Sequence, residues 1–177
     1  MLRRCKNCNF PVFCDEKICP DCGTPIGDKK MEKIKIKKLN SNATIPTRGS
    51  EYAAGYDLYA CIDRGAMDIH VGATVKINTG IATEIPDGYF GAVFARSGLA
   101  TKRGLRPSNC VGVVDSDYRG EVIVALHNDS DQCQTIHHGD RIAQLVIMPY
   151  LIVEFEEVDN LSDTDRGTGG FGSTGTK

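Results

Sequence analysis

One short stretch decides the fold class, the six residues EVIVAL at positions 121–126. Apolar side chains recur there at every second position, which is the period of a β-strand, and we expect Ile123 to be buried on both faces. The residues IKIK at positions 34–37 alternate in the same way. We also predict strands over residues 141–150 and 151–158, with a hinge near Pro149.

Turn signals separate these strands at Pro86–Gly88, Asp129–Asp131 and His138–Asp140. Helical periodicity is nearly absent, and only Ser97–Arg103 can hold a single turn or a short helix. The polar, glycine-rich tail after Asp159 is expected to be disordered on its own. Closely spaced strands of this kind predict an all-β barrel or sandwich.

The composition is that of a globular protein. The chain has 177 residues, of which 41% are hydrophobic and 25% charged, enough for one domain and a small extra module. Its apolar runs fall well short of the ~20 residues that cross a membrane. Its first residues, Met1–Arg4, do not lead into the apolar core of a signal peptide. We therefore expect an intracellular, cytoplasmic protein with no membrane partner.

Charge is unevenly distributed along the chain. Residues 1–38 carry ten Lys/Arg and five Asp/Glu, whereas the whole chain has a formal net charge of −2. The six lysines between Lys29 and Lys38 fit a solvated linker and strand face. A nucleic-acid contact is the alternative, although no aromatic residues are interleaved with these lysines.

A cluster of cysteines opens the chain, because five of the eight lie in the first 22 residues. Cys5-x-x-Cys8 and Cys19-x-x-Cys22 form two pairs, and two such turns supply the four thiolates of a closed, structural zinc site. Redox or disulfide pairing is the alternative, which a cytosolic setting disfavours. Cys14 is either a spare thiol or an alternative ligand.

Five stretches in the remainder stand out by their polar and glycine-rich composition. They are Ala54–Leu58 (AGYDL), Ala95–Leu99 (ARSGL), Gly112–Glu121 (GVVDSDYRGE), Gly139–Leu145 (GDRIAQL) and Arg166–Gly175 (RGTGGFGSTG). The second stretch offers a guanidinium, a hydroxyl and a bare backbone amide, which suit phosphate oxygens. The last adds Arg166, several glycine amides and Phe171, on which a nucleotide base can stack. Asp115 lies at a strand end, where a general base would sit.

In this order the five stretches resemble the five motifs of the homotrimeric dUTPase family, over about Met31–Lys177. The resemblance implies a jelly-roll-like all-β barrel, a threefold trimer with active sites between subunits, and a C-terminal arm that closes over a site of other subunits. The expected organisation is a zinc ribbon, a linker, the dUTPase barrel and a flexible arm, over residues 1–27, 28–32, 33–160 and 161–177.

The activity implied by the resemblance is hydrolysis of dUTP to dUMP and pyrophosphate, by attack of water on the α-phosphorus. This reaction limits uracil incorporation into DNA and supplies dUMP for dTMP synthesis. Mg²⁺ is expected to bridge the triphosphate through waters, with few or no direct protein ligands.

The resemblance also implies roles for individual residues. Asp115 matches the general base, Tyr118 the ring beneath the sugar that excludes a 2′-hydroxyl, and Asn109 the amide that reads uracil. Asp57 matches a supporting acid, although a buried structural partner of Arg141 explains it equally well. The further substrate contacts are expected from Arg96, Ser97, Gly98, Gln144 and Gly112, and from the arm residues Arg166, Phe171 (over uracil), Gly172, Ser173 and Thr174.

Two other functions are compatible with parts of this sequence. A dCTP deaminase shares the fold and the Arg-Ser element, but it would use a glutamate base and would not need the Gly-Phe-Gly-Ser-Thr arm. A binding protein, in which the ribbon docks onto nucleic acid or a protein partner and the barrel is a scaffold, is the second alternative. The complete catalytic set favours the hydrolase, to which the ribbon can add a binding role.

Overall fold

The computed structural model describes residues 2–5, 7–13, 18–23, 33–63, 65–170 and 173. Its elements, in chain order, are β1 (Leu2–Arg4), β2 (Pro11–Phe13), β3 (Lys35–Lys38), β4 (Thr47–Arg48), β5 (Tyr56–Tyr59), β6 (Ala66–Ile69), β7 (Thr74–Asn78), β8 (Ile81–Glu84), β9 (Tyr89–Phe94), α1 (Ser97–Arg103), β10 (Leu105–Pro107), β11 (Gly112–Val114), β12 (Ile123–Asn128), β13 (Gln134–His137) and β14 (Arg141–Pro149). The prediction of an all-β fold is confirmed.

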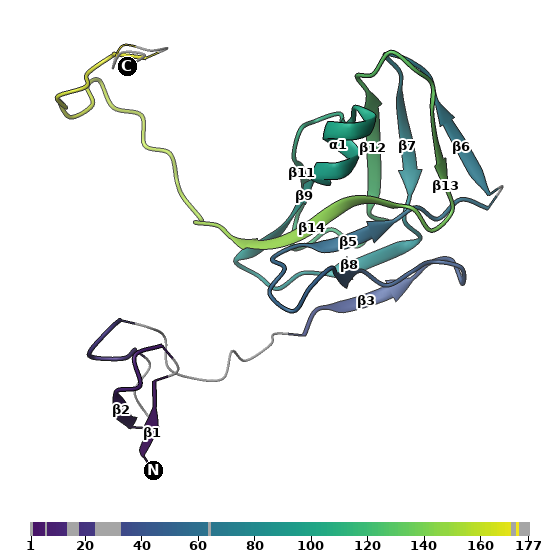
Figure 1. The fold of residues 1–177 in the computed structure, drawn as a ribbon. Helices are drawn as coiled ribbons and strands as arrows, with labels where there is room; N and C mark the ends of the chain where they lie inside the picture. Colours follow the sequence, from purple (N-terminus) through teal and green to yellow (C-terminus); the bar gives the residue numbers. More distant parts are fainter. Residues whose placement is uncertain are drawn as a thin grey trace.

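The strands from β3 onward form one layered, jelly-roll-like β structure. The largest sheet has the order β11-β9-β14-β5-β4, a second has the order β10-β12-β7, and β13-β6 and β3-β8 form two-stranded sheets. In Figure 1, strands β6, β7, β12 and β13 run steeply, whereas β3, β5, β8 and β14 lie across them. Neighbouring strands pair antiparallel, but most of these pairs join strands that are far apart in the chain, such as β6 with β13 and β7 with β12.

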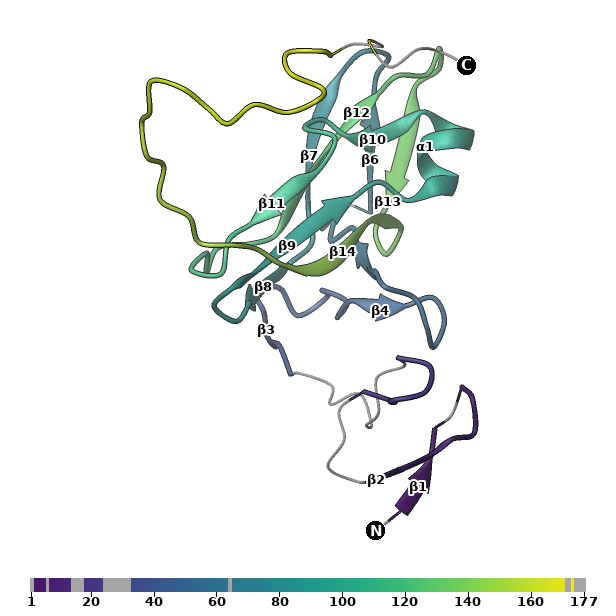
Figure 2. The same cartoon turned by 90° about the vertical axis from the view of Figure 1, so that its left-hand side faces the viewer.

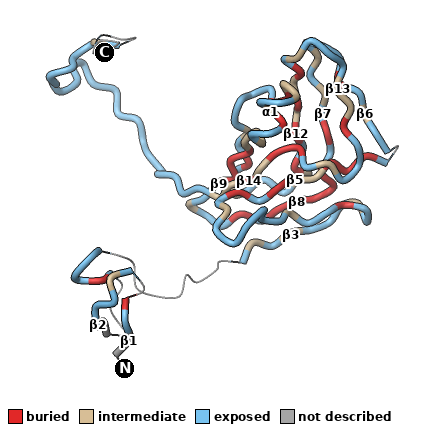
Figure 3. Tube along the Cα trace, in the orientation of Figure 1, coloured by how far each residue is buried: buried red, intermediate tan, exposed pale blue. Residues whose placement is uncertain are grey.

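The core lies between these layers and follows the period of the strands. In β12, Val124 and Leu126 are buried and alternate with more exposed positions. Figure 3 shows that the buried positions lie mainly along the barrel strands, whereas the chain after β14 is exposed. The expectation that Ile123 is buried on both faces is wrong, since 43% of this residue is exposed at the start of β12. Among the described residues, none covers Ile123 fully on the outer side of the strand.

A second correction concerns residues 151–158, which we expected to form a strand. The structure gives them no regular secondary structure, and all of them are exposed, including Leu151 and Ile152 at 85% and Phe155 at 94%. A β-strand needs a hydrogen-bonded neighbour, and no described strand pairs with this segment. The preceding strand, predicted over 141–150, is confirmed as β14 between β5 and β9.

The short helix expected at Ser97–Arg103 is confirmed as α1. It ends at Gly104, which adopts the left-handed conformation (φ 63°) and donates its N–H to the carbonyl of Ala100. A Cβ atom at Gly104 would also lie 2.8 Å from the backbone nitrogen of Ser130. Figure 2 shows α1 beside β13, where Arg103 Nη2 donates to the carbonyl of Thr135 at 2.6 Å.

Near the N-terminus, β1 and β2 form an antiparallel hairpin. The residues predicted as the linker, 28–32, and Cys14 lie outside the described residues. Within the part of the chain that the structure describes, no helix is long and apolar enough to cross a membrane.

Candidate active site

Strand β11, the turn before it and the loop after it carry four of the predicted site residues. Asn109 lies in the turn, where Val111 N–H donates to the Asn109 carbonyl at 2.7 Å. Gly112 begins β11, which pairs with β9. A Cβ atom at Gly112 would lie 3.2 Å from Val93 Cβ and 3.6 Å from Asn109 Nδ2. Glycine therefore lets the Asn109 amide lie close to the backbone of β11.

Two adjoining cavities lie along these strands. The first has a volume of about 140 Å³ and is lined by Asn109 and Gly112, together with residues of β9, β10, β11 and β12. The second has a volume of about 340 Å³ and is lined by Asp115, Tyr118 and residues 121–123. Both are lined by the apolar side chains Val113, Val114 and Ile123. The two cavities therefore form one continuous surface, with the Asn109 amide at one end and the Asp115 carboxylate at the other.

Tyr118 is held in the loop by its neighbours. Its N–H donates to the Asp115 carbonyl at 3.2 Å, and its hydroxyl donates to the Glu121 carbonyl at 3.0 Å. The ring lies against Gly120, where any Cβ atom would collide with it. Asp115, just after the end of β11, is exposed. The structure thus brings Asp115 and Tyr118 to the same cavity.

A second cluster forms around Asp57 in β5, which is 2% exposed. Arg96 Nε donates to Asp57 Oδ1 at 2.9 Å, Arg141 Nη1 to Oδ2 at 3.2 Å, and Gln144 Nε2 to Oδ1 at 3.2 Å. Strand pairing explains why these side chains lie together. Gln144 in β14 lies opposite Asp57 in β5 and also opposite Phe94 in β9, two residues before Arg96. A buried carboxylate needs such partners, since an unpaired charge there would be costly.

The alternatives left open for Asp57 can therefore be refined. It is a buried partner of Arg141, as one of them held, but it binds Arg96 as well. Ser97 and Gly98 follow Arg96 as exposed residues in the first turn of α1. The first N–H groups of a helix have no intrahelical acceptor. Arg96, Ser97 and Gly98 thus present a guanidinium, a hydroxyl and free amides on one side of the Asp57 cluster.

The arm forms a third group, separate from the other two. Arg166 Nε donates to the Gly169 carbonyl at 2.8 Å, and turns join Gly167 to Thr164 and Ser173 to Gly170. Phe171, Gly172 and Thr174 lie outside the described residues. Across the described residues of the arm, 161–170 and 173, hydrogen bonds are made only within the arm itself.

The side chains of the four cysteines predicted as metal ligands lie close together. Their sulfur atoms all lie within 4.8 Å of one another, with Cys5–Cys22 at 3.7 Å and Cys8–Cys19 at 3.6 Å. A disulfide would hold two sulfurs at about 2.05 Å. A tetrahedron with metal–sulfur bonds of about 2.3 Å has edges of roughly 3.8 Å, which these distances approach. The cluster can therefore hold a tetrahedral metal ion.

The backbone around the cysteines repeats the same turn twice. Asn9 N–H donates to the Cys5 carbonyl at 3.0 Å, and Gly23 N–H donates to the Cys19 carbonyl at 2.9 Å. Asn9 and Gly23 both have a positive φ, of 62° and 69°. Backbone N–H groups of Cys8 and Asn7 lower the pKa of the Cys5 thiol, which favours the thiolate that binds a metal.

Comparisons with known proteins agree with this geometry. The profile of the family described as dUTPase matches residues 41–175. A deoxyuridine 5′-triphosphate nucleotidohydrolase of Desulfitobacterium hafniense (strain DSM 10664 / DCB-2) is 48% identical over 150 residues, covering 82% of this chain and 99% of the relative. The corresponding protein of Anaplasma marginale (strain St. Maries) is 45% identical over 148 residues, covering 82% of this chain and 100% of the relative.

Solved structures give the same result. The dUTPase of Staphylococcus bacteriophage 80alpha with dUPNHPP superposes with a TM-score of 0.71 at 28% identity, covering 82% of this chain and 99% of that one. A mutant dUTPase from phage phi11 of S. aureus, described as coordinating a structural Mg(II) ion, superposes with a TM-score of 0.64 at 26% identity, covering 73% and 98% of the two chains. The chain belongs to the dUTPase family.

Proposed function

We propose that this chain hydrolyses dUTP to dUMP and pyrophosphate. The two adjoining cavities carry the proposal, because they put an amide and a carboxylate at opposite ends of one apolar surface. Asn109 hydrogen-bonds the polar edge of uracil in the smaller cavity, while the deoxyribose lies on Tyr118 in the larger one. The α-phosphate then lies near Asp115.

In the reaction, a water molecule donates a hydrogen bond to Asp115. Its oxygen attacks the α-phosphorus while its proton moves to the carboxylate. The bond from the α-phosphorus to the bridging oxygen breaks, and pyrophosphate leaves with the electron pair. Arg96, Ser97, Gly98 and Gln144 hold the phosphate oxygens, because guanidinium, hydroxyl and amide groups donate to the charge that develops there.

Magnesium fits this site as part of the bound substrate. The Asp57 carboxylate already accepts hydrogen bonds from three side chains, which leaves little capacity to ligate a metal directly. Mg²⁺ commonly keeps several waters and binds substrate phosphates, so triphosphate oxygens and waters are its natural ligands here. When bound, it neutralises phosphate charge. A dUTPase similar in structure carries a structural Mg(II) ion.

A panel of nucleoside triphosphates tests the activity. With Mg²⁺ present, we expect pyrophosphate release from dUTP, and values of kcat/KM at least ~10²-fold lower for UTP and dCTP. Tyr118 leaves no room for a 2′-hydroxyl, and dCTP presents the wrong polar edge to Asn109. Equal rates with dUTP and UTP would contradict the proposal. Ammonia release from dCTP would support the deaminase instead.

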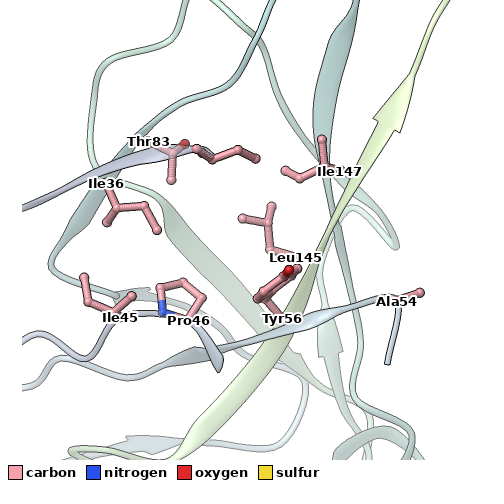
Figure 4. Close-up of a pocket in the computed structure, with 9 residues that line it drawn as sticks. Ile36, Ile45, Pro46, Ala54, Tyr56, Thr83, Leu145 and Ile147 are labelled. Carbon is pink, nitrogen blue, oxygen red and sulfur yellow. The ribbon is translucent and has the colours of Figure 1, made fainter. Parts of the chain in front are cut away.

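We propose further that three copies of the chain assemble and exchange residues 151–158. An apolar groove of about 440 Å³ opens between β3, β5 and β14. Figure 4 shows Ile36, Tyr56, Leu145 and Ile147 pointing into it. Thr83 also lines the groove, and its Oγ1 is the one buried side-chain oxygen without a partner in the described part of the chain. A peptide segment from a second copy would cover the apolar side chains and supply a partner for Thr83.

The charge pattern also favours residues 151–158 of a second copy as the segment that fills the groove. In β3, which pairs with β8 alone among the described strands, Ile36 alternates with Lys35 and Lys37. In the exposed segment, Val153 and Phe155 alternate with acidic residues, Glu154 and Glu156. If the segment joins the free edge of β3, its apolar side covers the groove and its acidic side meets the lysines. This pairing accounts for a strand pattern that has no partner in the single chain.

Substitution of Phe155 by Glu should therefore dissociate the assembly. The side chain is 94% exposed in the single chain, so the folded monomer loses nothing, whereas a charge in the apolar groove is costly. Sedimentation equilibrium measures the effect. The matched control is Val71→Glu, at an exposed apolar residue in the turn after β6. An intact trimer with Phe155→Glu would contradict the exchange.

We propose that the cysteine cluster binds zinc. In the proposed organisation of the chain, residues 1–27 form a ribbon, 28–32 a linker, 33–160 the barrel and 161–177 the arm. Zn²⁺ favours four thiolates in a tetrahedron, and a closed site of this kind is structural. So short a ribbon cannot bury a core, and metal binding is expected to supply its folding energy, roughly 10–16 kcal/mol. Thiolates that bind a metal and form no disulfides suit a cytoplasmic location, where we place the protein.

Elemental analysis should find one zinc ion per chain. Cys22→Ser should remove or weaken it, because the tetrahedron loses one ligand, whereas Cys133→Ser should leave it unchanged. A chain that starts at Met31 should bind no zinc but still hydrolyse dUTP. Absence of metal from the full-length protein, together with a disulfide between Cys5 and Cys22, would overturn the assignment.

The ribbon adds a possible second role, binding of nucleic acid or a protein partner. The basic balance of the first 38 residues supports nucleic acid. Such binding would weaken as salt rises, because lysine–phosphate contacts release counterions. Loss of salt-dependent DNA binding on removal of residues 1–30 would assign it to the ribbon.

A further inference from the structure

Glu121 closes the loop that carries Asp115 and Tyr118, and its carboxylate connects this loop to another part of the barrel. Oε1 accepts the Gly80 N–H at 2.6 Å, and Oε2 accepts Asn78 Nδ2 at 3.0 Å. Asn78 ends β7 and Gly80 lies in the turn before β8, about 40 residues away in sequence. Both carboxylate oxygens of Glu121 thus accept hydrogen bonds from the region between β7 and β8.

The backbone of the same residue holds Tyr118. Its carbonyl accepts the Tyr118 hydroxyl at 3.0 Å, while the ring lies against Gly120. Glu121 and Tyr118 both line the cavity that contains Asp115. The position of the phenol ring relative to Asp115 therefore depends on where Glu121 is held, and the carboxylate fixes that position against the β7–β8 turn.

We propose that Glu121 is a positioning residue for sugar selection: its carboxylate holds the loop so that the Tyr118 ring leaves no space for a 2′-hydroxyl. This inference rests on the proposed hydrolysis of dUTP. When the carboxylate is removed, Gly80 N–H and Asn78 Nδ2 lose their acceptor and the loop can move away from the turn. The ring then moves with the Glu121 carbonyl, and ribose gains room.

A purely structural role for Glu121 makes a different prediction. The backbone of the next residue is also held, because Val122 N–H donates to the Ile81 carbonyl at 2.9 Å and Thr79 Oγ1 donates to the Val122 carbonyl. If those bonds are sufficient to place the loop, loss of the carboxylate lowers stability but leaves the preference for dUTP over UTP unchanged. The ratio of kcat/KM for the two nucleotides therefore separates the two roles.

The experiment compares that ratio in the full-length protein and its variants. Glu121→Ala should lower the ratio roughly tenfold, the change expected when a partly buried N–H group is left without its acceptor. We expect a higher KM for dUTP, with kcat reduced less. Glu121→Gln should restore most of the ratio, because its oxygen accepts from Gly80 and the Asn78 amide can turn to accept from the new NH₂ group.

Two further variants complete the design. Asn78→Ala removes one partner of the carboxylate and leaves Gly80 bound, so it should lower the ratio by a smaller factor. It also decides the question if Glu121→Ala fails to fold. The matched control is Asp68→Ala, which removes an exposed carboxylate that accepts Thr135 Oγ1 at 2.6 Å on the β6–β13 pair. Its ratio should equal that of the unmodified protein.

The outcomes are distinct. If the unmodified protein prefers dUTP and the folded Glu121→Ala and Asn78→Ala variants keep that preference within twofold, the inference is wrong and the proposed function stands. If the unmodified protein does not hydrolyse dUTP, the proposed function itself fails. A reduced ratio in the Glu121 and Asn78 variants, with a normal ratio for Asp68→Ala, supports the inference.

Discussion

Substitution of Asp115 by Asn should lower kcat for dUTP by at least ~10²–10⁴-fold, while nucleotide binding remains nearly intact. Asparagine keeps the size of the side chain and can still hydrogen-bond the sugar, but it cannot accept the proton of the attacking water. The loss should therefore appear in kcat and much less in the dissociation constant of an unreactive dUTP analogue.

The same loop supplies a control for this prediction. Asp117 is two residues further along, is also exposed, and has no role in the proposed mechanism. Asp117→Asn should retain turnover within a few-fold, since it changes the charge of the loop by the same amount. Steady-state kinetics together with titration calorimetry measures both variants. Near-normal turnover with Asp115→Asn would remove this carboxylate from the mechanism.

The sequence was sufficient to predict those elements whose determinants are local. The alternation of Val124 and Leu126 predicts β12, and Gly104 after a short helical stretch fits the end of α1. The cysteine spacing also predicted a cluster that the fold does assemble, because each Cys-x-x-Cys turn is built within a few residues. In each case the predictive signal lies in residues that are close together in sequence, which a pattern can record.

Features that depend on distant parts of the chain were missed or wrong. The role of Asp57 stayed open because its partners Arg96 and Arg141 are 39 and 84 residues away, and only strand pairing brings them together. The contact of Glu121 was not predicted, because its partner turn is about 40 residues distant. The sequence suggested the Asp57–Arg141 pair as one alternative, but its pattern contains no signal for the contact of Asp57 with Arg96 or for that of Glu121 with the β7–β8 turn.

Two errors share one feature, an apolar strand pattern that stays exposed, and we propose that neighbouring chains cover both segments. Ile123 and residues 151–158 have the apolar pattern of buried strands, yet both are exposed in the single chain. An apolar strand pattern reports that a residue will be covered, not which chain covers it. The three groups of predicted site residues also remain apart in one chain, which agrees with the proposal that sites form between subunits.

Deletion of residues 163–177 should abolish most dUTP hydrolysis and leave a folded trimer. The described part of the arm makes hydrogen bonds only with itself, and its residues up to 168 are exposed, so the barrel loses no support. The deletion also keeps residues 151–158, which we propose hold the trimer together. Weak binding of dUMP should remain, because Asn109 and Tyr118 are unaffected.

The expected loss follows from what the arm offers a triphosphate. Residues 166–175 include five glycines, so ordering the arm carries a high entropic cost. Arg166, Ser173 and Thr174 can offset that cost only when the outer phosphates are present. Closure then excludes water around the α-phosphate and orients the attacking molecule. The arm therefore contributes to turnover of dUTP far more than to binding of dUMP.

A single substitution in the arm should cause a smaller loss of dUTP hydrolysis than its deletion. Phe171→Ala removes the ring proposed to stack on uracil, and base stacking of this kind is worth roughly 1–3 kcal/mol. Its kcat/KM for dUTP should lie between those of the intact and truncated proteins, with no change in assembly. The decisive measurement is the hydrolysis rate of the truncated protein, beside sedimentation to confirm that it is still a trimer. If that trimer hydrolyses dUTP at the full-length rate, the arm does not close over the site, and the proposed link between this tail and catalysis is wrong.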